Sequence, residues 1–269
     1  MPGDGKTLLK AALAFGLCLA AAGPAAAQTV ADDWERTDIG NDVRAVLALP
    51  DAPAFTVTCS SGQLVVLVTG LPSAVQADRT LGGCIRRGDQ TLSMPWIASA
   101  GTEALAGAPR PVARALRRGG RITLSVPGQT QYDLDLPVQS AAVADVMARC
   151  DTPLEDPRDA LPALDYTGMT WGREPVPSLP DRIRQNGLAV VSCVTTDNGH
   201  LRNCVIESEF PVGFEMGRTA LQAYRIASVR RLDRGPVPDG HLLTAAVTVR
   251  CQRCRPSPRS PLTPPGIGR

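Results

Sequence analysis

The sequence predicts an α+β protein in which a mostly-β part precedes a compact unit of order α-β-β-α-β. In the first part, β-branched runs flank short polar turns. The second part contains, in order, a helical turn, two segments that alternate apolar and polar side chains, an amphipathic segment and a further alternating segment. A Pro-rich stretch lies between them. The predicted division is a signal peptide at 1–27, a mostly-β domain of unrecognised family at 28–150, a Pro-rich linker at 151–178, a carboxy-terminal domain at 179–251 and a disordered Pro/Arg-rich tail at 252–269.

The first 27 residues have the composition of a secretory signal. Two lysines precede a short apolar run at residues 11–22, and the small residues Ala25, Ala26 and Ala27 provide a cleavage site. This run is shorter than the roughly 20 residues that span a bilayer as a helix. We therefore expect export and a periplasmic location. The alternative is an uncleaved segment that anchors the protein in the inner membrane.

Charge and residue types exclude several functions. Cleavage after Ala27 removes two lysines and one aspartate from the 28 basic and 26 acidic residues, so the mature chain is nearly neutral and does not attract nucleic acid as a whole. No lysine follows Lys10, and we find no serine nucleophile elbow, phosphate loop or paired histidine ligands. We therefore predict no enzyme activity, catalytic residue, cofactor, metal site, nucleic-acid partner or small-molecule substrate.

The first part is expected to contain two β-hairpins. The β-branched runs 55–59 and 63–68 flank a Ser-Ser-Gly turn. Residues 122–126 and 132–136 alternate apolar and polar side chains on either side of a second turn, which predicts a hairpin with one solvent-facing side.

Two short helices are expected in the same part, at residues 111–118 and 139–149. Gly119 and Gly120 end the first helix. Arginines cluster in and after it, and we interpret them as a solvated face; the alternative is a site for an anionic partner. The cluster comprises Arg114, Arg117, Arg118 and Arg121.

Asn198-Gly199 predicts a two-residue hairpin turn in the second part, because both residues tolerate the positive φ of a type I′ turn. A two-residue loop pairs Val191 with Ile206 and Cys193 with Cys204 on one face, which we predict to be the core face. Directly opposed cysteines suit a disulfide geometrically. Two buried thiols are the alternative.

An amphipathic helix and a final strand follow this hairpin. The helix stripe is expected to contain Phe214, Gly217, Leu221 and Tyr224. Residues 242–251 then alternate apolar and polar side chains and form the last strand.

This order of elements resembles the carboxy-terminal domain of the TonB family, over about residues 176–251. The resemblance implies that the last strand lies at a sheet edge and pairs with an extended segment of an envelope or outer-membrane protein. Energy-transducing members have an uncleaved amino-terminal helix and a long Pro-rich spacer, so we expect no energy coupling here. The partner-binding residues that the resemblance implies are Thr244, Val247, Thr248 and Val249.

Seven cysteines remain after cleavage, and in an oxidising compartment they favour disulfides. The candidates are Cys193, Cys204, Cys251 and Cys254. We predict a protein-binding module in the cell envelope. The alternatives are a structural or assembly factor of the envelope, and a thiol-disulfide enzyme that uses Cys251 and Cys254.

Overall fold

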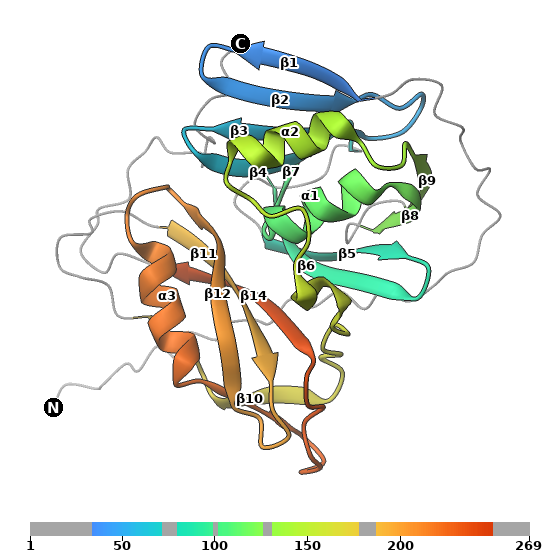
Figure 1. Ribbon diagram of the computed structural model, residues 1–269. Helices are drawn as coiled ribbons and strands as arrows, with labels where there is room; N and C mark the ends of the chain where they lie inside the picture. Colours follow the sequence, from blue (N-terminus) through green and yellow to red (C-terminus); the bar gives the residue numbers. More distant parts are fainter. Residues whose placement is uncertain (1–33, 72–79, 99–101, 126–130, 178–186, 250–269) are drawn as a thin grey trace, which may run out of the picture.

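The computed structural model describes residues 34–71, 80–98, 102–125, 131–177 and 187–249 (Figure 1). The signal peptide, the helical turn expected before Gly187, and the tail with Cys251 and Cys254 lie outside the described residues. The described chain is a mixed α+β protein of mostly antiparallel strands with three α-helices, which confirms the predicted class at this level.

The first part contains one antiparallel sheet in the order β1-β2-β3-β4-β7-β6-β5-β8-β9. The two predicted hairpins are confirmed as β3–β4 and β8–β9. Ser61 and Gly62 form the first turn with φ values of 51° and 77°. The strands are β1 (Glu35–Ile39), β2 (Asp42–Leu47), β3 (Ala54–Ser60), β4 (Gln63–Thr69), β5 (Thr80–Arg87), β6 (Gln90–Ala98), β7 (Ala104–Ala106), β8 (Gly120–Ser125) and β9 (Tyr132–Leu136).

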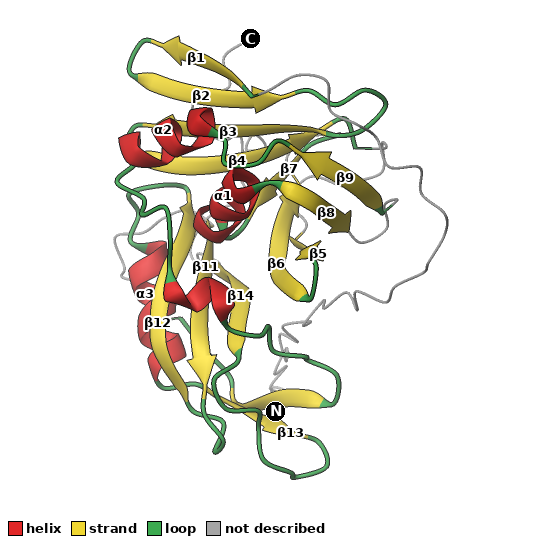
Figure 2. Ribbon diagram, turned by 45° about the vertical axis from the view of Figure 1, so that its right-hand side comes forward, coloured by secondary structure: helices red, strands yellow, loops and turns green. Residues whose placement is uncertain are grey.

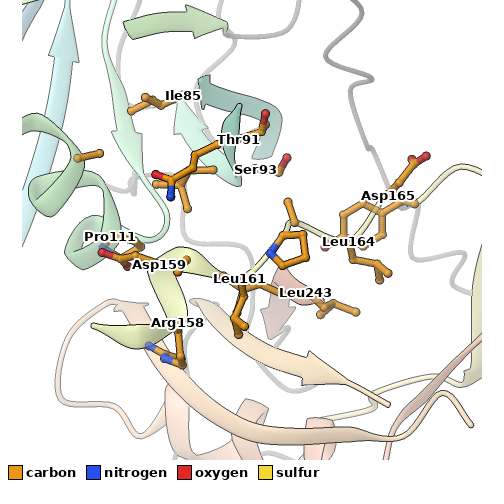
Figure 3. Close-up of a pocket in the computed structure, with 18 of the residues that line it drawn as sticks. Ile85, Thr91, Ser93, Pro111, Arg158, Asp159, Leu161, Leu164, Asp165 and Leu243 are labelled. Carbon is orange, nitrogen blue, oxygen red and sulfur yellow. The ribbon is translucent and has the colours of Figure 1, made fainter. Parts of the chain in front are cut away.

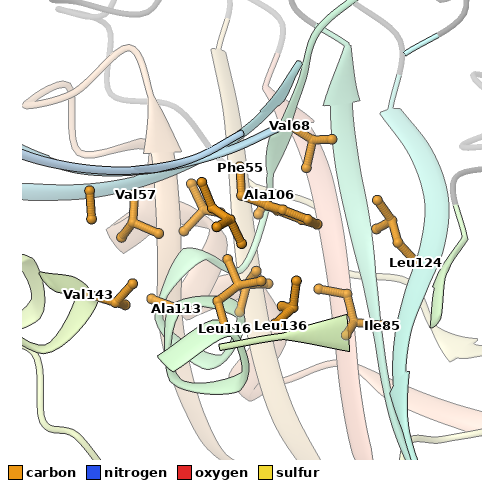
Figure 4. Close-up of a cluster of buried hydrophobic side chains, with 14 of the residues drawn as sticks. Phe55, Val57, Val68, Ile85, Ala106, Ala113, Leu116, Leu124, Leu136 and Val143 are labelled. Carbon is orange, nitrogen blue, oxygen red and sulfur yellow. The ribbon is translucent and has the colours of Figure 1, made fainter. Parts of the chain in front are cut away.

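Helices α1 (Pro109–Arg118) and α2 (Ala141–Arg149) cover one face of this sheet (Figure 2) and confirm both predicted helices. Apolar side chains from the helices and the sheet form the main core (Figure 4). The helix α1 ends at Gly119, which has a φ of 59° and would place a Cβ 1.9 Å from the Pro137 carbonyl oxygen. The Oγ of Ser140 caps α2 by accepting a hydrogen bond from the Val143 amide at 3.3 Å.

The second part contains a three-stranded antiparallel sheet in the order β12-β11-β14. The helix α3 (Met216–Arg225) packs on one face of it. The predicted order β-β-α-β is therefore confirmed, with a short strand added between the helix and the last strand. The strands are β11 (Gly187–Thr195), β12 (Leu201–Phe210) and β14 (Leu242–Val249), and β10 (Met169–Arg173) pairs with the added strand β13 (Ser228–Arg231).

The turn between β11 and β12 differs from the predicted two-residue loop. The amide of Thr196 donates to the His200 carbonyl at 3.0 Å, and the Gly199 amide donates to the Thr196 carbonyl at 2.8 Å, so the loop contains three residues. A β-bulge at Asn203, with a φ of 50°, adds one residue to β12 and restores the expected register. Val191 pairs with Ile206 as predicted.

The helix α3 begins later than predicted. Its first residue is Met216, and Phe214 lies before the helix with 42% of its surface exposed. The chain enters the helix only after Glu215, which has a left-handed backbone conformation. Gly217 and Tyr224 are buried as predicted and Leu221 packs against the core, while Met216 and Ala220 complete the buried face.

The central strand of the three-stranded sheet is buried on both faces, which corrects the prediction of a single core face. All nine residues of β11 are buried. Leu188 and Val190 leave the α3 side and pack against Leu67, Ile97 and Leu105 of the first part. The strands β4, β7 and β6 thus lie between their own helices and the second sheet, and the two parts share a core.

The Pro-rich segment 151–177 is packed, which corrects the prediction of an extended linker. Leu164 is buried in the core beneath α3, together with the partly buried Tyr166 and Trp171. Residues 169–173 form β10. Prolines exclude this segment from regular helix, but its apolar residues between the prolines still bury against the second sheet.

Two disulfides join described cysteines. The predicted bond between Cys193 and Cys204 is present, with Cα atoms 4.1 Å apart. A second bond, which sequence reasoning did not pair, joins Cys59 to Cys150 with Cα atoms 5.5 Å apart. Together they indicate an oxidising, extracytoplasmic compartment. In the described ranges, no helix combines the length and hydrophobicity that a bilayer crossing requires.

Candidate functional site

The outer edge of β14 is the first candidate site. This strand pairs with β11 on one side, and its backbone groups alternate in direction along the strand. The Leu242 and Thr244 groups are bonded on the side away from β11. By the same alternation, Ala246 and Thr248 also direct their N–H and C=O groups away from β11.

A segment of the same chain covers the first half of this edge. The Leu242 amide donates to the Pro162 carbonyl at 2.8 Å, and the Leu164 amide donates to the Leu242 carbonyl at 2.9 Å, which forms a parallel bridge. The Tyr166 hydroxyl accepts a hydrogen bond from the Thr244 amide at 3.1 Å and donates to the Thr244 carbonyl at 3.2 Å. The outer backbone groups of Leu242 are therefore bonded to another main-chain segment, and those of Thr244 are bonded to a tyrosine hydroxyl.

The second half of the edge has no such cover among the described residues. Their backbone hydrogen bonds include none to the outer N–H or C=O groups of Ala246 and Thr248. The Thr248 side chain is exposed. The described strand carries no charged side chain and no proline, which are the usual features that protect an edge from pairing.

The predicted binding residues differ in whether their backbone groups are already bonded within the chain. Thr244 is buried and its outer backbone groups are bonded by Tyr166, so it is not a free part of the edge. Val247 packs against the core beneath α3, and its backbone faces β11. The position of the Val249 side chain lies outside the description. Thr248 directs its backbone groups away from β11, and so does Ala246, which was not among the residues that the resemblance implied.

Tyr166 gives a direct test of the covered half. Burial raises the pKa of Tyr166 far above its usual value, so the phenol stays protonated while the protein is folded. We expect Tyr166→Phe to lower the free energy of unfolding by about 2 kcal/mol, because it leaves two buried backbone groups of Thr244 without a partner. Urea unfolding of both proteins measures the loss.

Tyr132→Phe is the matched control, since the Tyr132 hydroxyl has no hydrogen bond among the described residues, and it should change stability by less than about 0.5 kcal/mol. Equal losses in the two variants would show that the Tyr166 hydroxyl does not hold the edge.

The second candidate site is a cleft of about 780 Å³ between the β5–β6 hairpin and residues 158–171 (Figure 3). The start of β14 and one side of α1 complete its wall. Most of the lining is apolar, and its large apolar residues include Ile85, Leu92, Leu161, Leu164, Met169 and Trp171.

An ion-pair network connects the two parts of the chain beside this cleft. The Arg114 side chain is 1% exposed and donates from Nε and Nη2 to both carboxylate oxygens of Asp159, at 2.7 and 2.8 Å. Arg118 pairs with the same carboxylate at 3.2 Å. Arg158 pairs with Asp156 at 3.2 Å and with Glu207 at 3.4 Å.

This network corrects the prediction of a solvated arginine face, at least for Arg114. The residue lies on the side of α1 that faces the Pro-rich segment, where Asp156 and Asp159 neutralise it. Burial alone would raise the pKa of Asp156, but hydrogen bonds from Arg158 and the charges of Arg158 and Arg114 lower it below its usual value. Asp156 therefore stabilises the fold at neutral pH, and this contribution is lost as the pH falls through the lowered pKa.

In the second sheet, Ser192 of β11 and Glu207 of β12 are buried and hydrogen-bonded to each other. The Arg158 guanidinium donates to the Ser192 hydroxyl at 3.0 Å. The charges of Arg118, Arg158 and Asp159 beside the cleft are thus paired within the chain, whereas Asp89 and Asp165, which also line the cleft, have no ion pair among the described residues. In the described ranges, no group of three His, Cys, Asp or Glu side chains converges as a metal site.

No family model, no curated protein and no solved structure matches this chain. The open half of the β14 edge lies in the strand where the sequence resemblance implies partner binding.

Proposed function

We propose that this chain is a periplasmic protein-interaction module of the TonB-like type, which binds an extended segment of another envelope protein at the edge of β14. The observation that carries this proposal is the half-covered edge. The chain itself pairs with Leu242 and Thr244, while Ala246 and Thr248 offer the same backbone groups further along the strand.

Edge pairing supplies affinity through backbone hydrogen bonds, and side chains at alternate positions supply selectivity. Residues 162–164 run parallel to β14 where they pair with it. A partner strand that continues this row beyond Tyr166 would bond to Ala246 and Thr248. The oxidised cysteines agree with a periplasmic site of action.

The test is a proline at the open end of the edge. Thr248→Pro removes an outward N–H and leaves the backbone pairing with β11 intact, because Thr248 does not direct its amide to β11. We expect partner capture to fall by about fivefold to tenfold, as the loss of one well-formed hydrogen bond predicts. Crosslinking of the tagged full-length chain in intact cells, followed by mass spectrometry, measures capture.

Thr248→Ala is the control, because it changes the side chain and keeps the amide. It should retain the same crosslinked protein at nearly the parent level. Circular dichroism and a melting curve establish that both variants fold. Equal capture by a folded Thr248→Pro protein and the parent would rule out this binding mode.

A further inference from the structure

One edge of the strand β6 is unpaired along most of its length among the described residues. It contains residues Gln90–Ala98, and β5 pairs with it from Gln90 to Ile97. On its other side, β7 pairs only with Trp96, Ile97 and Ala98. In the described part of the chain, no strand pairs with this side of β6 before Trp96.

The free backbone groups of β6 can be assigned from the hairpin geometry. Arg87 and Gln90 flank a two-residue turn and therefore form a hydrogen-bonded pair. Alternation then directs the N–H and C=O groups of Thr91 and Ser93 away from β5. The carbonyl of Pro95 has the same direction, and it accepts a hydrogen bond from the Gly107 amide at 2.8 Å on this side of the strand.

This free edge borders the cleft. Thr91 and Ser93 line it from β6, and Leu161 lines it from the Pro-rich segment across from them (Figure 3). Ala163 also belongs to the lining. Because Pro162 and Leu164 bond to Leu242, Ala163 directs its own N–H and C=O away from β14. The cleft therefore has polar backbone groups on two walls and apolar side chains between them.

The apolar floor of the cleft favours apolar side chains in its occupant. Arg118 is paired with Asp159, and Arg158 is paired with Asp156 and Glu207. Asp89, Asp165 and Arg87 also line the cleft and have no ion pair among the described residues, and the Arg87 Nε donates to the Gly119 carbonyl at 3.0 Å. A charged ligand side chain that lies over the apolar floor would be desolvated there. An apolar side chain gains from the same burial.

We propose that this cleft is a second binding site, for an extended peptide segment of a partner protein that carries apolar residues at alternate positions. The peptide lies beside Thr91 and Ser93 as a strand in line with β7, and its apolar side chains contact the cleft floor. The volume of about 780 Å³ lies in the range of pockets that bury whole ligands. This site is separate from the β14 edge and does not depend on it.

The probe is the capped peptide acetyl-Val-Thr-Val-Thr-Val-amide, titrated into the full isotope-labelled chain and followed by NMR. We expect the amide signals of Thr91 and Ser93 to shift, with a Kd below about 1 mM. Ser93→Pro removes one N–H that points away from β5. The strand already contains a proline at Pro95, whose backbone faces the same side. The substitution should raise the Kd at least about fivefold. Ser93→Ala keeps the amide and should stay within about twofold.

Two control peptides define the chemistry. Replacing the valines by glutamate should abolish binding, and N-methylation of the threonine amides should weaken it. Absence of shifts at Thr91 and Ser93 at about 5 mM peptide would overturn the proposal. An unchanged Kd in folded Ser93→Pro protein would do the same. Shifts confined to Ala246 and Thr248 would support the β14 edge and reject the cleft, so the two sites succeed or fail separately.

Discussion

Replacing Cys59 and Cys150 by alanine is expected to lower the free energy of unfolding by about 4 to 5 kcal/mol. The disulfide joins β3 to the end of α2 across a sequence separation of 91 residues. A crosslink over so long a loop removes much conformational freedom from the unfolded chain and therefore stabilises the folded state strongly. Urea unfolding under oxidising conditions measures the loss.

The bond between Cys193 and Cys204 is the matched comparison, because it closes a separation of only 11 residues. Its removal by the same substitution should cost about 3 kcal/mol. The loss of unfolding free energy should therefore be larger for the long loop than for the short loop. A larger loss from the short loop than from the long loop would contradict the view that chain entropy dominates both effects.

Replacing Arg114 by methionine is expected to lower the free energy of unfolding by about 3 to 5 kcal/mol. The substitution keeps the side chain long and removes its charge, which leaves the carboxylate of Asp159 with only the longer contact to Arg118. A buried charge that loses its main partner costs far more than the pair contributes as a unit. The double change Arg114→Met with Asp159→Leu should recover most of the loss.

Arg121→Met is the surface control for this experiment. Arg121 pairs with Asp135 at 3.5 Å, but its side chain is 66% exposed, so its removal should cost less than about 1 kcal/mol. Similar losses for Arg114→Met and Arg121→Met would show that the buried network does not hold the two parts together.

The hairpin of the second part shows how much local sequence can predict. Asn198-Gly199 correctly located the turn, and the pairing of Cys193 with Cys204 was correct. The loop length was wrong by one residue, because Gly199 alone takes the positive φ there. The bulge at Asn203 compensated for this difference. Asparagine tolerates positive φ, so the residue was compatible with a bulge, but nothing in the strand pattern required one.

Contacts between distant segments could not be predicted in the same way. Tyr166 bonds to Thr244 across a sequence separation of 78, and Arg114 bonds to Asp159 across 45. Periodicity describes which face of one element is apolar, and it carries no information about which remote segment covers that face. The Pro-rich composition of residues 151–177 also favoured a linker, although its scattered apolar residues are what pack.

The burial of both faces of the second sheet did have a signal. Residues Leu188–Val191 form a continuous apolar run, as do residues Leu64–Val68 of β4. Such runs indicate strands that are covered on both sides. The two runs meet through Leu188, Val190 and Leu67 in the shared core. Weighing this feature would have predicted that the parts pack together.

The most direct measurement of the central claim is amide hydrogen exchange along β14, resolved by residue, with and without the partner segment that crosslinking identifies. Edge pairing predicts that the amides of Ala246 and Thr248 become at least about tenfold more protected in the complex. The Val247 amide faces β11 in both states and should change little. Binding that protects other residues and leaves Ala246 and Thr248 as they are in the free protein would contradict partner capture at this edge.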